Sequence, residues 1–453
     1  MTKNIDIFES DPIPRAVAKL AIPTVASMLV AVIYNMVDTF FVGKLGDPNQ
    51  VAAVSIATPV FLFLMAAGNM FGMGGSSFIS RALGEKKIDK VRHISSFCFY
   101  GSIAIGLAGA IFFLGGMKTI LSLIGSSEAT APFAKDYLSY IAYGAPLVVL
   151  STAYSNLVRG EGAANTAMIG MMSGTVANII LDPIMILTLK MGVSGAAIAT
   201  VIGNGVSLAI YLVHICSKKS LLSINIKDFR IGERIATSVI AIGLPASLNN
   251  ILMSLSNIVL NNFLSSYGDI PVASMGVAMK ANMLVVFLQI GVAAGVQPLI
   301  GYCYGAKNYK RMKGTMRFAM LTNLVIGCVM TTIYIFFSRN IISMFISDEK
   351  VIETGNMMLR ALMISAPILG ALFIFNFSFQ AMGKALQALA LSISRQGFVF
   401  LPMLFIGRAI AGLNGLIYAQ PTADFVSIFI AFAMFMFLNK SFKAMEHQSK
   451  TVS

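Results

Sequence analysis

The chain has few charged residues and few residues of the kinds that bind metals. Charged side chains make up 11% of its 453 residues, about half the fraction found in soluble domains. Its three histidines and four cysteines lack the spacing of a metal site, and the cysteines fit as small apolar packing residues. A membrane-embedded enzyme would need paired loop acids that bind magnesium, or a histidine-rich metal site, and the sequence has neither. These shortages argue against a soluble protein and against an enzyme.

Apolar residues take the place of the missing charges. They make up 57% of the chain, and the mean hydropathy is +0.80. Apolar runs of about 20 residues, enough to cross a bilayer core of about 30 Å as helices, recur throughout and leave only short loops. The polar segment before Asp11 lacks the pattern of a cleaved leader, so the first span is expected to act as its own insertion signal. The twelve predicted spans are 17–41, 51–80, 94–117, 136–158, 166–189, 193–215, 237–264, 272–301, 318–338, 357–380, 386–406 and 413–438.

The net charge of +14 could indicate nucleic-acid binding, but the placement of the basic residues argues otherwise. They cluster in connections on one side of the predicted spans, at 81–92, 218–234, 307–317 and 440–450, while the other side has few. By the positive-inside bias, the basic side and both termini are cytoplasmic. The sequence therefore predicts a multi-pass protein of the cytoplasmic (inner) membrane, in contact with the lipid bilayer and not with nucleic acid.

The second half of the chain repeats the first with an offset of about 222 residues. Pro23 matches Pro245, and Asn35 matches Asn257. Further matches are Gly46-Asp47 with Gly268-Asp269, Pro146 with Pro367, Gly162 with Gly383, and Pro183 with Pro402. In so apolar a chain, a parallel repeat predicts two six-helix lobes, residues 1–225 and 226–453, related by an axis along the membrane normal and arranged around a central site.

Three short segments of the first half carry a recognisable pattern. Residues 34–43 read YNMVDTFFVG, residues 159–162 read RGEG, and residues 178–183 read NIILDP. Together they resemble the multidrug and toxic compound extrusion (MATE) family of bacterial and archaeal transporters, and the resemblance runs over essentially the whole chain. It implies two lobes around a central cavity. It also implies export of small organic, often cationic, drug-like compounds, driven by inward flow of sodium ions or protons and without a further cofactor.

Ionisable residues inside the predicted spans are the first candidates for function, because a charge near the bilayer centre costs about 2.5 to 3.5 kcal/mol. Asp38 lies near the outer end of the first span, one turn from Tyr34. Asn178 and Asp182 are four residues apart, so they share one helix face about 6 Å apart along its axis. Thr200 falls at a similar depth in the sixth span. The resemblance implies that Asp38, Asn178, Asp182 and Thr200 form the cation-coupling site.

The residue types of this set suit a sodium ion or a proton. Carboxylate, amide and hydroxyl oxygens are hard donors, and two carboxylates forced together in a partly dry lobe cannot both stay charged. Neither acid recurs in the second half, where the matching residues are Leu260 and Leu401, although a purely architectural acid would be expected twice. The alternative is that Asp38 is a solvated helix end and Asp182 braces a kink at Pro183.

The second half has intramembrane charges of its own, Lys280, Arg395 and Asp424. They form either a polar substrate-binding or gating network, or an internal ion pair in which Asp424 neutralises Arg395 or Lys280. The other candidate cavity or gating residues are Tyr34, Asn35, Asn257 and Gln289. Bends are expected where a proline removes a helix hydrogen bond, at Pro23, Pro59, Pro146, Pro183, Pro245, Pro298, Pro367, Pro402 and Pro421.

Arg159 and Glu161 flank a glycine at a predicted cytoplasmic turn and are interpreted as a clasp within the first repeat. The whole sequence favours an all-α membrane antiporter that works by alternating access and is expected to be a monomer. The alternatives are a flippase for a lipid-linked precursor, which would need a wide basic cavity for a pyrophosphate head group, and a channel. The choice between sodium and proton stays open.

Overall fold

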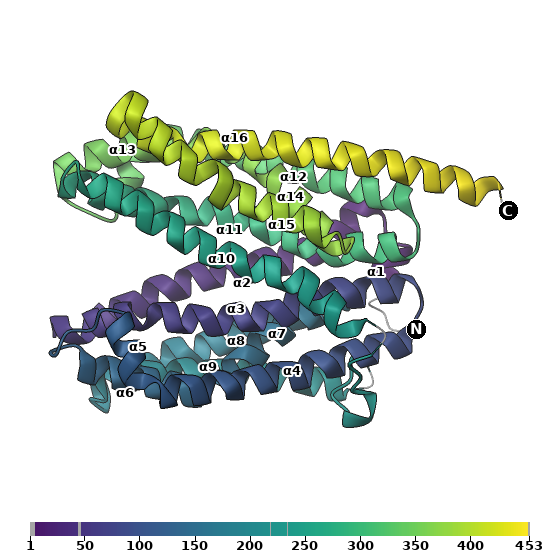
Figure 1. Ribbon diagram of the computed structural model, residues 1–453, viewed down its shortest axis with the longest axis horizontal. Coiled ribbons are helices and arrows are strands. Elements are labelled where there is room, and N and C mark those ends of the chain that lie inside the picture. The colour runs from purple at the N-terminus through teal and green to yellow at the C-terminus, as the bar shows by residue number, and fades with distance from the viewer. Residues whose placement is uncertain (1–4, 44–46, 218, 233, 452–453) are drawn as a thin grey trace. The chain divides into compact units, whose positions relative to one another are not determined.

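The computed structural model describes residues 5–43, 47–217, 219–232 and 234–451, and within this part every regular element is helical. The first half contains α1 (Ile5–Glu9), α2 (Ile13–Gly43), α3 (Pro48–Gly84), α4 (Ile88–Gly115), α5 (Met117–Leu123), α6 (Ala131–Tyr143), α7 (Ala145–Gly160), α8 (Ala164–Pro183), a π-helical segment (Ile184–Thr188) and α9 (Gly192–Cys216) (Figure 1). The fold class predicted from the sequence, an all-α membrane protein, is confirmed.

The second half follows the same plan. A short 3-10 turn (Ile226–Asp228) precedes α10 (Ile235–Ser265), α11 (Asp269–Gly305), α12 (Tyr309–Ser343), α13 (Glu349–Met363), α14 (Ala366–Ala381), α15 (Ala385–Ile393), a second π-helical segment (Ser394–Val399) and α16 (Phe400–Thr451). Among the described residues, nine helices are long and apolar enough to cross a membrane, and two bent pairs raise this to as many as 11. Each of the twelve predicted spans falls on one of these helical runs.

The predicted spans 386–406 and 413–438 are not separated by a loop. They lie in one helical run, Ala385–Lys440, which is broken at Gly412. This residue has φ 57° and ψ −127°, a left-handed conformation that favours glycine because it has no side chain.

Two of the expected proline bends coincide with broken spans. Pro146 lies in the first turn of α7, at a bend of 57° between α6 and α7. Pro367 lies in the first turn of α14, at a bend of 50° between α13 and α14. A proline is tolerated in a first helical turn, because the backbone N–H it lacks would have no partner in the helix there. The matched positions of the two halves therefore bend in the same way.

The helices form two compact units that do not coincide with the two halves of the sequence. Unit 1 comprises Met1–Ser10 and Ala26–Ser247, and unit 2 comprises Asp11–Val25 and Leu248–Ser453. The beginning of α2 thus packs in unit 2, where a Cβ on Gly295 would lie 2.7 Å from the Cα of Ala21. The beginning of α10 packs in unit 1, where Ser247 Oγ donates a hydrogen bond to the Ala66 carbonyl at 2.7 Å. The predicted lobe boundary at residues 225 and 226 stays a prediction.

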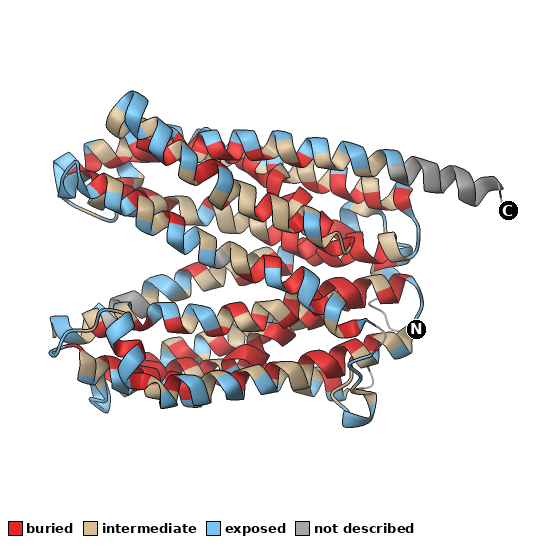
Figure 2. Cartoon of the chain, in the orientation of Figure 1, coloured by how far each residue is buried: buried red, intermediate tan, exposed pale blue. Residues whose placement is uncertain are grey.

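Exposed residues recur along most of the helices (Figure 2), and many of them are large and apolar. Phe336 on α12 is 76% exposed, and Ile111 and Phe112 on α4 are similarly open. Soluble proteins rarely expose so much contiguous apolar surface. Outward-facing side chains of this kind suit lipid, so the burial pattern agrees with the membrane-spanning helices.

We expect the close approach of α3 and α10 within unit 1 to tolerate no side chain at Gly243. An ideal Cβ there would lie 1.8 Å from the carbonyl oxygen of Met70, a backbone atom that cannot move aside cheaply. Gly243→Ala should therefore lower the stability of the purified protein by about 2 kcal/mol or more. Gly276→Ala is the matched control, because no atom lies within 4 Å of that position. A thermal melt in detergent in which both variants behave alike would contradict the expected close contact.

Candidate functional site

Three of the four predicted ion-site residues lie on two neighbouring helices of unit 1. Asn178 and Asp182 come from α8 and Thr200 from α9, and all three are buried. Asn178 Nδ2 donates to Thr200 Oγ1 at 3.4 Å, and Thr200 Oγ1 donates to the Ala196 carbonyl at 2.9 Å. Glycine permits this approach, because a Cβ on Gly203 would lie 2.7 Å from the Gly174 carbonyl oxygen. The helix pair thus brings an amide, a carboxylate and a hydroxyl together.

The side-chain amide oxygen of Asn178 accepts no hydrogen bond from the described residues. Its side chain is 3% exposed, and among the described residues its Oδ1 atom has no hydrogen-bond partner. Because Nδ2 donates to Thr200, Oδ1 is the atom that must be satisfied in another way. Asp182, one turn further along α8, is 0% exposed. A buried carboxylate and an unsatisfied amide oxygen one turn apart on the same helix are oxygen donors of the kind that a cation or a proton binds. The residues present therefore fit the predicted coupling ion.

Asp38, the fourth predicted ligand, lies on α2, but its side chain is outside the described residues. Its part in the site stays a prediction. Tyr34 and Asn35 lie on the same helix, where Tyr34 is half-buried and Asn35 is exposed. Asn35 Nδ2 donates to the Ala31 carbonyl at 2.7 Å. Asn257 is half-buried on α10.

The end of α8 departs from regular helix next to Asp182. Pro183 is the last residue of α8, and residues Ile184–Thr188 continue as a π-helical turn. The Leu189 N–H donates to the Ile184 carbonyl at 2.8 Å and closes the wider turn. Such turns occur often at functional sites. The proline was the only signal of this irregularity in the sequence.

Arg395 and Asp424 form an ion pair in unit 2, in which Asp424 is buried and Arg395 is half-buried. Arg395 Nε donates to Asp424 Oδ1 at 2.8 Å, and its guanidinium lies 5.2 Å from the ring centroid of Phe373. Asp424 also accepts hydrogen bonds from Gln420 Nε2 at 3.0 Å and from Ser365 Oγ at 2.8 Å. The carboxylate is therefore satisfied by three protein donors. Of the two readings of these charges, the internal ion pair is the one that the structure contains.

Lys280 is not the partner of Asp424. Its side chain is exposed, and it makes no hydrogen bond or ion pair with the described residues. Sequence spacing could not distinguish Lys280 from Arg395, because the pairing depends on how α11, the second π-helical segment and α16 pack. Ser365, which the sequence did not single out, lies at the bend between α13 and α14 and ties this bend to Asp424.

Gln289 also serves the bend between α13 and α14. It is fully buried, and its Nε2 donates to the Ala366 carbonyl at 2.7 Å. Asn323, another residue missed from the sequence, donates to the Gln289 and Gly370 carbonyls at 3.2 and 3.1 Å. Gln289, expected at a cavity, therefore acts within the helix core of unit 2.

The expected clasp of Arg159 and Glu161 involves only Glu161. Its carboxylate is 3% exposed and accepts from His214 Nε2 at 2.6 Å, from the Leu221 N–H at 3.0 Å and from Ser220 Oγ. It thus fixes the connection after α9 to the end of α7. Arg159 is 8% exposed and makes no hydrogen bond or ion pair with the residues described. The interpretation of Arg159 as part of a clasp is wrong, because Glu161 alone makes the bonds that hold the connection after α9.

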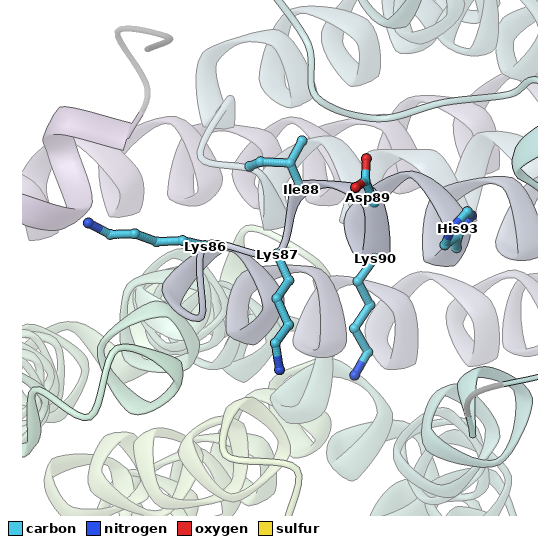
Figure 3. A pocket seen from close by; sticks show the side chains of 6 residues that line it. All are labelled: Lys86, Lys87, Ile88, Asp89, Lys90 and His93. Atoms are coloured by element: carbon cyan, nitrogen blue, oxygen red, sulfur yellow. The ribbon is translucent and has the colours of Figure 1, made fainter.

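A hollow of about 520 Å³ lies at the turn between α3 and α4, lined by Lys86, Lys87, Ile88, Asp89, Lys90 and His93. Lys87, just before α4, and Lys90, in its first turn, point the same way, whereas Asp89 points to the other side (Figure 3). Lys87 is paired with Glu85 at 2.8 Å, and the hydrogen bond to Glu85 raises the pKa of Lys87 above its usual value. With its excess of lysine, this hollow suits anions and shares no residue with the predicted cation site.

Comparison with known proteins gives one consistent family. The MatE family model matches residues 23–184 and 245–406, two stretches whose offset is that of the internal repeat. The multidrug export protein MepA of Staphylococcus haemolyticus (strain JCSC1435) is 33% identical over 424 residues, covering 94% of this chain and 93% of that protein. The protein of the same name from Staphylococcus aureus (strain NCTC 8325 / PS 47) is 33% identical over 417 residues, covering 92% of each chain.

Solved structures agree with the sequence matches. The outward-facing conformation of a multidrug resistance MATE family transporter of the MOP superfamily superposes with a TM-score of 0.93 at 26% identity, covering 98% of this chain and 99% of that one. MATE in a straight and in a bent conformation give TM-scores of 0.93 and 0.92, also at 26% identity. Each of these two matches covers 98% of this chain and nearly all of the chain in the solved structure.

Proposed function

Because the chain belongs to the MATE family of multi-pass membrane transporters, we propose that it is a secondary antiporter that exports small organic, often cationic compounds in exchange for sodium ions or protons. Its relatives of 33% identity are named multidrug export proteins, which supports the substrate class. We also propose that both termini are cytoplasmic, from the placement of the basic loops, and that the protein works as a monomer.

The observation that carries this proposal is the buried group formed by Asn178, Asp182 and Thr200. It offers a carboxylate and a free amide oxygen with a hydroxyl beside them, buried within one helix pair. These are oxygen donors of the kind that a cation or a proton would bind. The site recurs nowhere in the second half, where Leu401 stands in place of Asp182. An asymmetric cation site suits alternating access better than a channel.

The link from ion to substrate is proposed to run through α2. This helix carries Asp38 towards its outer end and Pro23 inside it. Its beginning packs in unit 2 and its remainder in unit 1, so a change at Asp38 acts on a helix that both units share. A bound ion biases two conformations only through its different affinity for each of them. The outward-open form must therefore bind substrate less well once the acids are neutralised.

The flippase alternative gains no support from the charges of unit 2. A pyrophosphate head group needs free cations, but the Arg395 guanidinium is held by Asp424. Lys280 alone is a weak basis for binding two phosphates. The antiporter is therefore the function that the buried residues favour.

We expect sodium ions or protons to compete with the exported compound. Affinity of the purified protein for a fluorescent organic cation should fall by about 5- to 150-fold, the usual range of such coupling. The measurement is a binding titration in detergent, first with rising sodium at fixed pH and then with falling pH at fixed sodium. The titration that has an effect identifies the coupling ion, and Asp182→Asn should be insensitive to it. If neither titration weakens binding to the wild type, the proposed exchange is wrong.

A further inference from the structure

One face of α9 is polar from Thr200 to His214. It consists of Thr200, Asn204, Ser207, Tyr211 and His214, which are three or four residues apart and therefore share a side of the helix. Thr200, Ser207 and Tyr211 are buried, and Asn204 and His214 are half-buried. This polar face of α9 begins at the proposed coupling site and ends beside Glu161, at the far end of the helix.

Glycine residues of α8 pack directly against the polar face of α9. A Cβ on Gly174 would lie 2.0 Å from Ser207 Oγ, and one on Gly170 would lie 2.2 Å from Cε1 of the Tyr211 ring. The hydroxyls are satisfied by backbone, since Ser207 Oγ donates to Gly203 and Tyr211 OH donates to Ala167, both at 3.2 Å. A continuous row of polar groups thus runs inside unit 1, from the coupling site towards one end of the helix pair.

Arg159 stands at the end of this row. It lies in the last turn of α7, a helix that packs against α9, and two residues before Glu161, which binds His214 at the end of the polar face. Glu161, two residues away, is occupied by His214 and by the connection after α9, so it does not neutralise Arg159. The positive charge of Arg159 is therefore nine-tenths buried without a partner among the described residues.

Packing alone does not require a charge at this position. The matching residue of the second half is Gln380, which is equally buried but neutral. Its Nε2 donates to Asn376 at 2.7 Å, and its Oε1 accepts from Gln297 at 3.4 Å. A buried unpaired charge is costly, and the carbonyl groups at the end of α7 offset only part of that cost. In the second half Arg395 is paired with Asp424, whereas Arg159 has no such partner among the described residues and lies in the half that holds Asp182. This difference indicates a function connected with the ion.

We propose that Arg159 is an electrostatic barrier at the inner end of the polar face of α9. A fixed positive charge raises the energy of any cation that enters the row of polar groups, as arginine does in pores that exclude cations and protons. Arg159 thereby prevents sodium ions or protons from crossing unit 1 without exchange for substrate. The inference rests on the proposed function, because the barrier matters only if Asp182 and Asn178 hold the coupling ion.

The test is uncoupled ion flux into proteoliposomes that contain the full-length protein and no organic substrate. A sodium gradient or a pH gradient is imposed, the membrane potential is clamped with potassium and valinomycin, and an enclosed ion-sensitive dye reports entry. Arg159→Gln should leak on the order of tenfold faster than the wild type, because one charge at about 10 Å has an effect of this size in partly buried surroundings. Arg159→Lys keeps the positive charge and should leak ions no faster than the wild type.

Controls separate the barrier from general damage. Arg159 donates no hydrogen bond, so Arg159→Gln and Arg159→Met strand no partner and should fold, as judged by thermal melting. Arg92→Gln removes an exposed charge early in α4 and should not leak. Arg159→Gln combined with Asp182→Asn should lose the leak, because the route passes through the coupling site.

Three results would overturn the inference. The first is that Arg159→Gln and Arg159→Met fold but leak ions no faster than the wild type. The second is a leak that persists after the added Asp182→Asn change. The third is that neither neutral variant folds, which would make Arg159 structural. The proposed function fails separately, if Asp182→Asn alone still exports against a gradient. If Arg159→Gln does not leak and Asp182→Asn does not export, the inferred barrier is refuted and the proposed antiporter function stands.

Discussion

Asp182→Asn abolishes gradient-driven export while the protein still folds and inserts. Asp182 is fully buried on α8, one turn from the free amide oxygen of Asn178. Asparagine has nearly the same shape but carries no negative charge, so the site loses the carboxylate that would attract a cation or accept a proton. We expect transport to fall by at least about 100-fold, which corresponds to roughly 2.7 kcal/mol of lost coupling. Asp38→Asn is expected to have the same effect.

The measurement is efflux of a fluorescent organic cation in inverted vesicles, driven in turn by an imposed sodium gradient and an imposed pH gradient. Asp136→Asn is the matched control, because Asp136 is exposed on α6 and should be dispensable. Protein content and melting temperature show whether each variant is folded. Full transport by Asp182→Asn under either gradient would refute the assignment of the ion site.

Asp424→Asn destabilises the protein without removing its ion dependence. The change weakens the ion pair and leaves the Arg395 guanidinium without a countercharge in unit 2. It also replaces a carboxylate that accepts from Ser365 at the bend between α13 and α14. Loss of one partner of a buried ion pair costs about 3 to 5 kcal/mol. The melting temperature in detergent should fall clearly, whereas the sodium or proton dependence of the remaining activity should be unchanged.

A double variant tests the physical reason for this loss. Replacing Arg395 with methionine and Asp424 with leucine removes both charges, so stability should recover in part relative to Asp424→Asn. A single variant that melts like the wild type but has lost its ion dependence would move the coupling site to unit 2. That outcome would contradict the structural role of Asp424.

The sequence predicted best what depends on local chain geometry. Asn178 and Asp182 could be placed on one helix face because their spacing of four matches the helical period. Pro146 and Pro367 marked the bends of two spans, since a proline removes a helix hydrogen bond. Thr200 comes from another helix, so no spacing rule links it to Asn178. Its place rested on the family resemblance, and in the structure the two side chains are in contact.

What the sequence predicted wrongly or left open depends on packing between helices. Arg159 and Glu161 are neighbours in sequence, but residues two apart at a helix end do not face each other. Glu161 accordingly binds His214, 53 residues away, and Arg159 has no such partner among the residues described. The choice between Lys280 and Arg395 as partner of Asp424 likewise depended on tertiary contacts. The π-helical segments were not predicted, because a proline indicates where a helix is disturbed but not how its hydrogen bonds are rearranged.

The exchange of helix beginnings between the two compact units constrains how the protein is made. During synthesis, Val25 and Ala21 of α2 leave the ribosome long before Gly291 and Gly295 of α11, against which they finally pack. Unit 1 in turn has to await the first turns of α10, where Ser247 bonds to Ala66. Neither half of the chain can complete its own packing before the other has begun to be translated. Two polypeptides divided at residues 225 and 226 should therefore assemble only when they are produced together in one membrane.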